Sequence, residues 1–405
     1  MGFLKKISDR LILPVIKRAL TEEPIEEYIA RMKVGIDTAD FGVTVNNATA
    51  LRFSATYACI RVRSENMASL PKNIKEKTSK GWEIAEHPIS NLINSKPNDY
   101  TNVFDFWQMM FANLDGWGNG YAIIERSGSG DPIALHQVHS SNVDVRVINS
   151  KKWFRVTGAT GRNGVYPNED MLHFMGLSFD GVEGVNPIEY NASSFAKALA
   201  ARKFGAEFYK KGGNIKGVLE TDSSMNDTQF DQFTKHFQES SQNYDTPLLE
   251  YGIKYKSIGI NPVSAQLLAT EEFSITDIAR IFNVPPHMIG DLTRSTFSNI
   301  EQQTIQFAQF ALRPTLKKIE TELEDKLFFT SDRLKFSVKF DINGLMRGDM
   351  AARGTWYAQM IQNGVYNRNE VRAIEGLTHK EGLDEFLYPS NMLVVGENNT
   401  TENEK

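Results

Sequence analysis

The 405-residue sequence has little cysteine, no long apolar run and no large excess of charge of either sign. Its single cysteine, Cys59, excludes a disulfide framework and a cysteine-rich metal site, and a reducing compartment is the simplest interpretation. Because no run of about 18 uncharged apolar residues occurs, the sequence predicts no transmembrane helix. The 45 Lys and Arg against 50 Asp and Glu give a net charge of −5, which argues against a basic surface that binds nucleic acid tightly.

Motifs for catalysis and for phosphate binding are also scarce. The glycine-rich segments 116–120 and 127–130 lack the Lys-Ser/Thr of a P-loop and the strand–GxGxxG–helix context of a dinucleotide fold, so we interpret both as hairpin turns. The seven histidines are scattered, and the pair His136 and His139 has no third metal ligand near it in the sequence. The sequence therefore predicts no enzyme, no metal site and no cofactor.

Two alternatives remain open at this level. An intracellular α/β hydrolase could use Cys59 or His173, although Cys59 lies on the apolar face of a predicted helix and no motif pairs it with a histidine. A peripheral membrane protein could use the basic, apolar segment 1–20. Pro14 interrupts that segment, and docking against a partner or a neighbouring subunit is the simpler interpretation.

The first half of the chain predicts a mixed α/β region. Residues 54–70 repeat apolar positions at helical spacing, with Ser54 as N-cap, and residues 103–116 predict a second helix with an apolar face. Short alternating segments, separated by Ser, Gly, Asn and Asp, predict an antiparallel sheet. They span residues 121–125, 133–138, 143–148, 153–157 and 171–174.

Helices dominate the second half. One predicted helix starts at Pro187 and runs to Lys211, and another spans residues 263–282 and ends before Pro285 and Pro286. A small α/β insert separates them, with predicted strands at 215–220, 247–251 and 254–258 and a helix at 227–239.

The longest predicted helix spans residues 297–328. It contains Pro314, where we expect a kink, and it carries Glu322 and Glu324 among Lys and Arg, which we interpret as a solvated face. A strand at 334–340 and two short helices follow, with Asp349 and Asn367 as their predicted N-caps.

An ordered series of short motifs spans about residues 50–375. It comprises Ala58-Cys59-Ile60-Arg61, Ala68-Ser69-Leu70-Pro71, His87-Pro88, Lys96-Pro97-Asn98, Gly118-Asn119-Gly120-Tyr121-Ala122, GVEGVNP at 181–187, IARIFNVPPHMIG at 278–290, TFSNIEQQ at 296–303, Arg347-Gly348-Asp349 and Asn369-Glu370-Val371-Arg372. This series resembles the portal (head-to-tail connector) proteins of tailed bacteriophages, of the type typical of long-tailed siphophages. The block at 278–303 is the most specific part.

The resemblance implies an α+β portal fold with a mixed α/β wing, long stem helices, a small α/β clip, a kinked long helix and a short helical crown. The implied ranges begin with an N-terminal arm at 1–45, the wing at 46–186 and the first stem helix at 187–213. The clip follows at 214–262, the second stem helix at 263–289 and the tunnel loop at 290–297. The rest of the wing with the kinked helix takes 298–345, the crown takes 346–385 and a disordered tail takes 386–405.

The resemblance also implies a function. A homo-oligomeric ring, usually a dodecamer, would sit at the portal vertex of the capsid in the virion, after assembly in the host cytoplasm. Double-stranded DNA would be packaged through its channel by the terminase large subunit and later ejected. Further implied partners are a head-tail adaptor and the major capsid or scaffolding protein, without a membrane. The motor would be the terminase, which agrees with the missing P-loop.

The implied DNA-contacting residues lie in the tunnel loop and comprise Leu292, Thr293, Arg294, Ser295 and Thr296. A nearly neutral channel lets DNA slide, whereas each tightly paired phosphate adds salt-dependent affinity. Arg294 is a candidate for weak phosphate contacts, or else it pairs with Asp291 or Glu301 of a neighbouring subunit.

Basic residues on the first stem helix are further candidates. They are Lys197, Arg202, Lys203, Lys210 and Lys211, and we expect them to include channel-facing or inter-subunit charges. An ordinary solvated helix face is the alternative.

Overall fold

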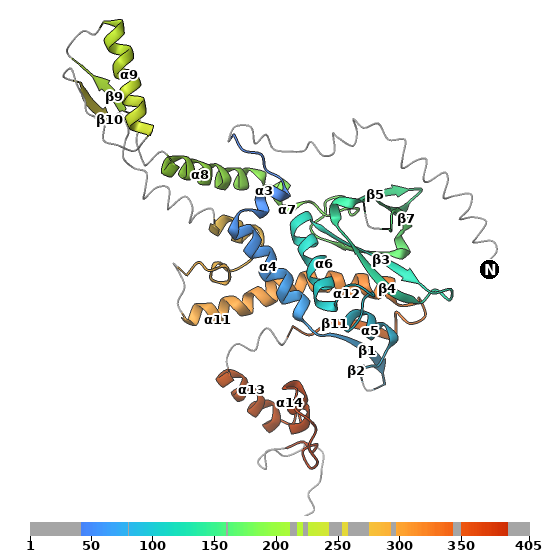
Figure 1. Cartoon of the computed structure of the whole chain (residues 1–405). Coiled ribbons are helices and arrows are strands. Elements are labelled where there is room, and N and C mark those ends of the chain that lie inside the picture. The colour runs from blue at the N-terminus through green and yellow to red at the C-terminus, as the bar shows by residue number, and fades with distance from the viewer. Residues whose placement is uncertain are drawn as a thin grey trace, which may run out of the picture. The chain divides into compact units, whose positions relative to one another are not determined.

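The computed structural model describes residues 42–79, 81–158, 161–210, 217–221, 226–242, 253–257, 275–292, 297–342 and 350–387 (Figure 1). These fall into two compact units. One is drawn from residues 1–295 and 309–341 and contains all the described strands, whereas the other is drawn from 296–308 and 342–405 and is helical. The predicted α+β class is confirmed.

Helices α4 (Ser54–Ser69) and α6 (Val103–Trp117) pack against each other at the centre of the first unit. Their predicted bounds are confirmed to within a residue or two. The predicted N-cap Ser54 is wrong: Phe53 holds that position without a side-chain hydrogen bond. A short helix, α3 (Asn47–Leu51), ends just before it, and burial of Phe53 outweighs the lost cap.

Outside the insert, the described strands form three antiparallel sheets of three strands each instead of one. Their orders are β11-β1-β2 (Phe336–Phe340, Lys72–Thr78, Gly81–Ile84), β4-β3-β8 (Pro132–Val138, Asn119–Arg126, Met171–Met175) and β5-β6-β7 (Val143–Ile148, Lys151–Val156, Gly164–Pro167). Asn149 and Ser150 join β5 to β6 with positive φ at both positions, as a two-residue hairpin turn requires.

The segment 116–120 is the end of α6 and the start of β3, so the predicted hairpin turn there is wrong. Gly118 caps the helix at φ 78°, and a Cβ on it would lie 2.1 Å from the Val185 carbonyl oxygen. Glycine is therefore required by both the left-handed backbone and the close approach of residue 185. The other predicted turn, 127–130, does join β3 to β4.

Two apolar clusters hold the first unit together. In one, the Trp107 ring from α6 contacts Phe111, Phe174 and Phe340, with centroid distances of 5.6, 6.0 and 5.8 Å. Its indole N–H donates to the Ile93 carbonyl oxygen (2.9 Å), which satisfies the one polar atom of the side chain. The other lies between sheets β4-β3-β8 and β5-β6-β7 and comprises Tyr121, Ile123, Val138, Val145, Phe154, Val156 and Met171.

Edge strand β11 is protected by the acidic side chains of α12 (Arg313–Leu327). The carboxylate of Glu324 accepts from the Val338 N–H, and that of Glu320 accepts from the Phe340 N–H, each at 3.0 Å. Glu322 accepts from the His173 N–H of β8, also at 3.0 Å. The interpretation of Glu322 and Glu324 as a solvated face is therefore wrong, because unpaired strand amides need acceptors.

The predicted helix 297–328 is interrupted more strongly than by a kink. It consists of α11 (Phe297–Gln306), a π-helical segment at Phe307–Leu312 and α12, with Pro314 in the first turn of α12. Proline has no N–H for the carbonyl of residue 310 and clashes with it, and a π-helical turn accommodates that mismatch. The expected disruption is confirmed, but it precedes the proline.

The predicted helix 187–211 is divided in two. Helix α7 (Pro187–Tyr190) starts at the predicted proline, Asn191 interrupts it, and α8 (Ala192–Lys210) continues. Lys211 lies outside the described residues. Of the predicted helix 263–282, residues 275–281 are described and are helical.

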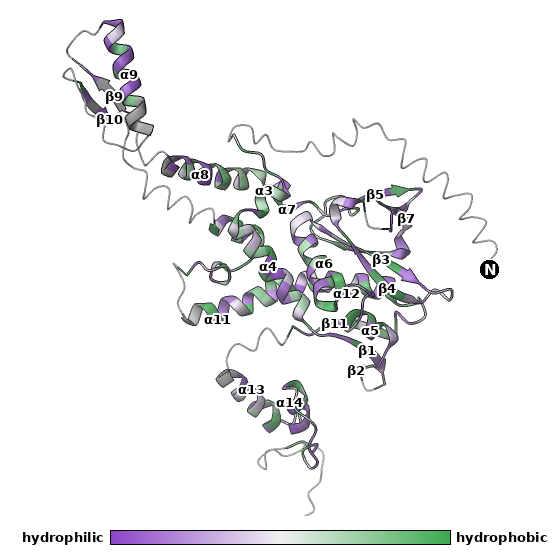
Figure 2. Cartoon of the chain, viewed as in Figure 1, coloured by the Kyte–Doolittle hydropathy of each residue, from purple (hydrophilic) through white to green (hydrophobic). Residues whose placement is uncertain are grey.

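The insert contains β9 (Gly217–Glu220), α9 (Asp227–Gln242) and β10 (Lys254–Ser257), with β9 and β10 antiparallel. Three of its four predicted elements are thus confirmed, and 247–251 lies outside the described residues. Figure 2 shows α9 as largely hydrophilic.

The second unit contains α11, α13 (Met350–Gln362) and α14 (Arg368–Ile374). The predicted capping box is confirmed: Asn367 accepts from the Glu370 N–H, and Glu370 accepts from the Asn367 N–H, both at 2.8 Å. Asp349 lies outside the described residues.

Lys72 gives the first testable prediction, because its ammonium is buried and no carboxylate of the described residues pairs with it. It donates to the Ala68 carbonyl oxygen (2.9 Å) and lies 5.0 Å from the Trp107 ring centroid. Burial lowers the pKa of Lys72 from 10.5 to about 8. We expect Lys72→Met to raise the free energy of unfolding at pH 7 by about 1–2 kcal/mol, because it removes a desolvated charge.

The sign of the pH dependence follows from that pKa. Between pH 8 and 10.5 the unfolded chain keeps the proton and the folded chain has lost it, so the wild type gains stability as pH rises. The advantage of Lys72→Met in urea unfolding should therefore shrink over this range. Exposed Lys77 on the same strand is the control, and Lys77→Met should stay within about 0.5 kcal/mol at every pH. A destabilised Lys72→Met at pH 7 would contradict the prediction.

Candidate functional site

The C-terminal end of α6 anchors the ends of two other helices through buried polar groups. Adjacent residues Asp115 and Gly116 provide the two attachment points. Asp115 connects through Arg63 to the end of helix 275–281. Gly116 connects through Asn47 and Asn186 to the start of α7. We call this arrangement the helix-end anchor; it comprises Asn47, Arg63, Asp115, Gly116, Asn186 and the Phe282 carbonyl group.

The first branch is a buried ion pair. Arg63 Nε donates to Asp115 Oδ2 at 2.9 Å, and both side chains are 8% exposed. Arg63 Nη1 donates to the Phe282 carbonyl oxygen at 3.0 Å. Burial raises the pKa of Asp115, and the Arg63 guanidinium opposes that shift. The guanidinium thus binds the carbonyl group of the residue that follows helix 275–281, at the end where the helix dipole favours a cation.

The second branch is a chain of asparagines. Asn47 Nδ2 donates to the Gly116 carbonyl oxygen (2.6 Å), and Asn186 Nδ2 donates to Asn47 Oδ1 (2.8 Å). Asn186 Oδ1 in turn accepts from the Ile188 N–H at 3.0 Å and caps α7, whose first residue is Pro187. The start of α7 is therefore fixed to α6 and α3.

Two of the sequence motifs meet beside this anchor. Asn119 Nδ2 donates to the Gly184 carbonyl oxygen (2.7 Å), and Asn119 Oδ1 accepts from the Gly184 N–H (2.8 Å). The motif at 118–122 is thus paired with the motif at 181–187. This pairing holds the segment that leads into α7.

The segment after Phe282 is packed where it begins, and its described part ends in an exposed residue. Val284 is buried, Asn283 has a positive φ of 52°, and the 3₁₀ helix η4 (Pro286–Ile289) packs against α4. Gly290 ends η4 at φ 90°. Leu292, one of the predicted DNA-contacting residues, is 62% exposed.

The other predicted tunnel-loop residues, Thr293, Arg294, Ser295 and Thr296, lie outside the described residues. Whether Arg294 contacts DNA or a neighbouring acid therefore stays a prediction.

The basic residues predicted on the first stem helix lie along α8. Lys197, Arg202, Lys203 and Lys210 are all exposed. Arg202 Nη1 donates to the Arg52 carbonyl oxygen at 3.2 Å, which brings α8 against the end of α3.

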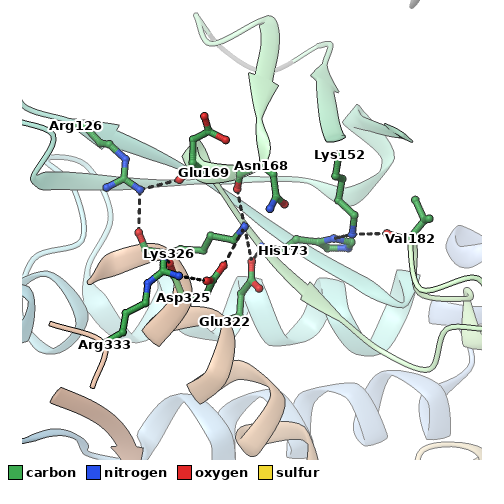
Figure 3. A network of polar contacts seen from close by, with 10 residues as sticks. All are labelled: Arg126, Lys152, Asn168, Glu169, His173, Val182, Glu322, Asp325, Lys326 and Arg333. Carbon is green, nitrogen blue, oxygen red and sulfur yellow. Dashed lines mark hydrogen bonds and ion pairs between the residues drawn. The ribbon is translucent and has the colours of Figure 1, made fainter. Parts of the chain in front are cut away.

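A second polar network joins α12 to the sheet β4-β3-β8 (Figure 3). The Lys326 side chain is only 4% exposed, and its ammonium donates to the Asn168 carbonyl oxygen at 2.8 Å. It also lies 3.6 Å from Asp325 and 4.0 Å from Glu322. Arg126 donates to the Lys326 carbonyl oxygen at 2.9 Å and fixes the end of α12.

His173 lies on the sheet side of this network. Its Nε2 is 2.8 Å from Asn119 Oδ1, and that oxygen is an acceptor, so Nε2 carries the proton. Its Nδ1 accepts from Lys152 Nζ at 3.4 Å. Burial, followed by the charges of Lys152 and Lys326, lowers the pKa of His173 to about 3.

These surroundings give no support to the hydrolase alternative. Burial raises the pKa of the Cys59 thiol to about 12, so the thiol stays protonated at neutral pH. Both ring nitrogens of His173 are occupied by structural hydrogen bonds. Among the described residues, no cluster of three His, Cys, Asp or Glu has metal-binding geometry, and His136 instead bonds to Glu125 at 2.8 Å.

The segment 1–20, on which the membrane alternative depends, lies outside the described residues. Of the helices that are described, none combines the length and the apolar character needed to cross a bilayer.

Motif reasoning missed the helix-end anchor, although the sequence carried a signal. Arg63 is four residues from Cys59 and four from Met67, and Asp115 is four residues from Phe111. A charged residue in register with an apolar helix face must be buried beside a counter-charge. Arg63 and Asp115 both meet this condition, so a contact between them could have been predicted from the sequence.

In all of these features, buried polar groups hold the ends of helices and cover the edges of sheets. In the described part of the chain they do not form a catalytic constellation. The family model for the phage portal protein matches residues 54–376, most of the chain and all of the helix-end anchor apart from Asn47. The chain therefore belongs to the phage portal protein family, whose members connect head and tail.

Individual relatives agree with this assignment. The chain is 31% identical to a probable portal protein of Streptomyces phage phiC31, across 98% of this chain and 90% of the relative. It is 27% identical to the portal protein of Enterobacteria phage HK97, across 84% and 82% of the two chains.

Solved structures share the fold at low sequence identity. An HK97-family phage portal protein from Corynebacterium diphtheriae matches with a TM-score of 0.57 at 15% identity, covering 75% of this chain and 98% of that one. A chain from the neck of a gene transfer agent particle, computed with C12 symmetry, matches with a TM-score of 0.55 at 17% identity, covering 82% and 92%. The predicted portal class and fold are confirmed.

Proposed function

We propose that this portal protein forms a ring of twelve identical subunits at one vertex of the capsid, with an axial channel for double-stranded DNA. DNA enters through the channel during packaging and leaves through it during ejection. The observation that carries the proposal is the match to the portal family over residues 54–376. The C12 neck of a structurally similar chain supports the choice of twelve.

The helix-end anchor suits this role mechanically. In the proposed ring, α7 with α8 forms the first stem helix, residues 263–289 form the second, and residues 290–297 form the tunnel loop. Asp115 and Gly116 hold the wing ends of both stems. A force on the loop is then transmitted to the packed centre of the wing, because buried polar contacts and close packing leave little freedom to yield.

The remaining assignments follow the order of the chain. The wing takes residues 46–186 and 298–345, and the crown takes 346–385. Residues 214–262 form a clip that binds the terminase large subunit and later the head-tail adaptor, while the rim of the ring contacts the major capsid or scaffolding protein. The portal itself has no catalytic activity, and the terminase supplies the energy. Assembly takes place in the host cytoplasm, before the portal vertex is built into the virion.

Negative-stain imaging of the purified protein tests the ring. We expect particles of uniform diameter with a central hole and twelvefold rotational symmetry. Cys59→Ala should form the same rings, because the buried thiol has no catalytic task. A lone compact particle under all assembly conditions, and inside the virus head, would contradict the proposal.

Deleting residues 292–295 tests the tunnel loop. We expect the variant to assemble into rings, because the root of the loop is fixed by Val284 and by the Arg63 contact to Phe282. Packaged DNA length or retention should fall, because the exposed Leu292 side chain and the residues proposed to contact DNA after it are lost. A deletion of the same length in the hairpin turn 127–130, whose Gly128 and Ser129 are exposed, is the control. Full titre from the loop variant would overturn the assignment.

A further inference from the structure

A groove on the first unit lies where the described chain begins. It has a volume of about 570 Å³ and is lined by residues 42–44, by α3 and by α8. Val43, Leu199 and Ala206 provide apolar lining. Figure 2 shows that α8 carries both apolar and polar residues along its length. We call this the arm groove.

The rim of the arm groove is basic. Arg52, Arg202 and Lys203 all line it, and all three are exposed. The Arg202 guanidinium donates to the Arg52 carbonyl oxygen (3.2 Å), and no carboxylate among the described residues pairs with any of the three. An apolar lining with a positive rim fits a partner that is apolar on one face and acidic on the other.

Such a segment exists in the part of the chain that precedes the groove. Residues 22–32 read EEPIEEYIARM. Ile25, Tyr28, Ile29 and Met32 recur at the spacing of one helix face. Four glutamates against one arginine give this short segment a net charge of −3.

We propose that residues 22–32 bind in the arm groove. Their apolar positions lie against Val43, Leu199 and Ala206, and their glutamates lie beside the three rim cations. The nine residues between Met32 and Gly42 make ten Cα–Cα steps and span about 33 Å when extended. The segment therefore reaches the groove of its own subunit, whose lining begins at Gly42, and docking on a neighbouring copy is the alternative that cross-linking separates.

The binding has a consequence that rests on the proposed function. Unpaired cations on a stem helix would hold DNA phosphates and add salt-dependent affinity. The glutamates of residues 22–32 neutralise Arg202 and Lys203 on α8, together with Arg52 at the end of α3, so these cations no longer add to the affinity for DNA. Of the basic residues on α8, Arg202 and Lys203 are thus assigned to the arm.

Engineered disulfides test the docking on the purified full-length protein. The native Cys59 is buried, and its thiol stays protonated, so it does not compete. We expect the pair Ile25→Cys with Ala206→Cys to form a disulfide at least tenfold faster than the control pair Ile25→Cys with Val147→Cys, because a disulfide requires Cα atoms within about 7 Å. Val147 is exposed on β5, away from the groove lining.

Gel mobility then identifies the copy that supplies the segment. A cross-link within one chain and a cross-link between chains both support the docking, and they separate the two sources. Equal rates for the test pair and the control pair would overturn it. Because the measurement needs no ring and no DNA, its failure leaves the proposed portal function to be judged by imaging.

Charge reversal tests the electrostatic part. Replacing Glu22, Glu23, Glu26 and Glu27 by Lys should slow the cross-link roughly tenfold, since exposed ion pairs are individually weak but act together. Adding Arg52→Glu, Arg202→Glu and Lys203→Glu should restore the rate. A reversed segment that cross-links as fast as the native one, or that the compensating changes do not rescue, would overturn the proposal.

Discussion

Asp115→Asn is expected to lower the free energy of unfolding by about 3–5 kcal/mol, because it leaves the buried Arg63 guanidinium without its counter-charge. The change conserves side-chain size, so a cavity cannot account for the loss. Urea unfolding at pH 7 measures it. The Lys96–Asp99 pair is the matched control, since its side chains are 63% and 93% exposed. Asp99→Asn should change stability by less than about 1 kcal/mol.

A second variant separates stability from anchoring. Arg63→Met combined with Asp115→Leu replaces the ion pair by apolar groups, and we expect it to recover most of the lost stability. It still leaves the Phe282 carbonyl oxygen without the Arg63 donor. Hydrogen exchange at the Asn283 and Val284 amides, which donate to Arg280 and Ala279, should therefore be faster than in the wild type although the protein is stable. Slow exchange at these amides in the double variant would show that Arg63 does not hold the loop root.

Acidification is expected to destabilise the fold through His173. Its pKa is about 3 in the folded chain and near 6.5 when unfolded, so between these values only the unfolded chain is protonated. The stabilisation is complete above pH 6.5 and is lost as pH falls toward 3, a change of about 3–5 kcal/mol over the full range. Protonation would place a cation beside Lys152 and Lys326.

His173→Gln tests this assignment. The variant should be less stable than the wild type at pH 7, because it loses the stacking on Tyr121 (4.6 Å). Its urea midpoint should change less between pH 7 and pH 4, because the titrating group is gone. Exposed His236 on α9 is the control, and His236→Gln should leave both the midpoint and its slope with pH unchanged. An unaltered slope in His173→Gln would show that another group carries the acid sensitivity.

Local elements were predictable from sequence because their signals are local. The apolar spacing of α6, the Asn367–Glu370 capping box and Pro187 at the start of α7 each act within a few residues. Strand β1 was missed because Ile74 is its only apolar residue. It is a strand because it pairs with β11, more than 250 residues later, and no local pattern records that partner.

The candidate site likewise combines motifs that could be recognised in the sequence with contacts that could not. The motif at 118–122, the motif at 181–187 and the block at 278–290 were all visible in the sequence. Their contacts were not: Asn119 clamps Gly184, and Arg63 reaches both Asp115 and Phe282. Glu322 and Glu324 were read as solvated because their acceptor role depends on strands brought near them by folding.

The sequence by itself determined the order of the elements, the absence of cysteine-rich and P-loop chemistry, and the ordered motifs of a portal protein. Those features depend on backbone propensity, apolar period and residue identity, which act along the chain. Only the tertiary structure decided which charges are buried, which carbonyl groups they cap and which strand edges they cover. The cost of desolvating a charge or an amide depends on neighbours distant in the sequence, and that cost selects the pairs that form the helix-end anchor.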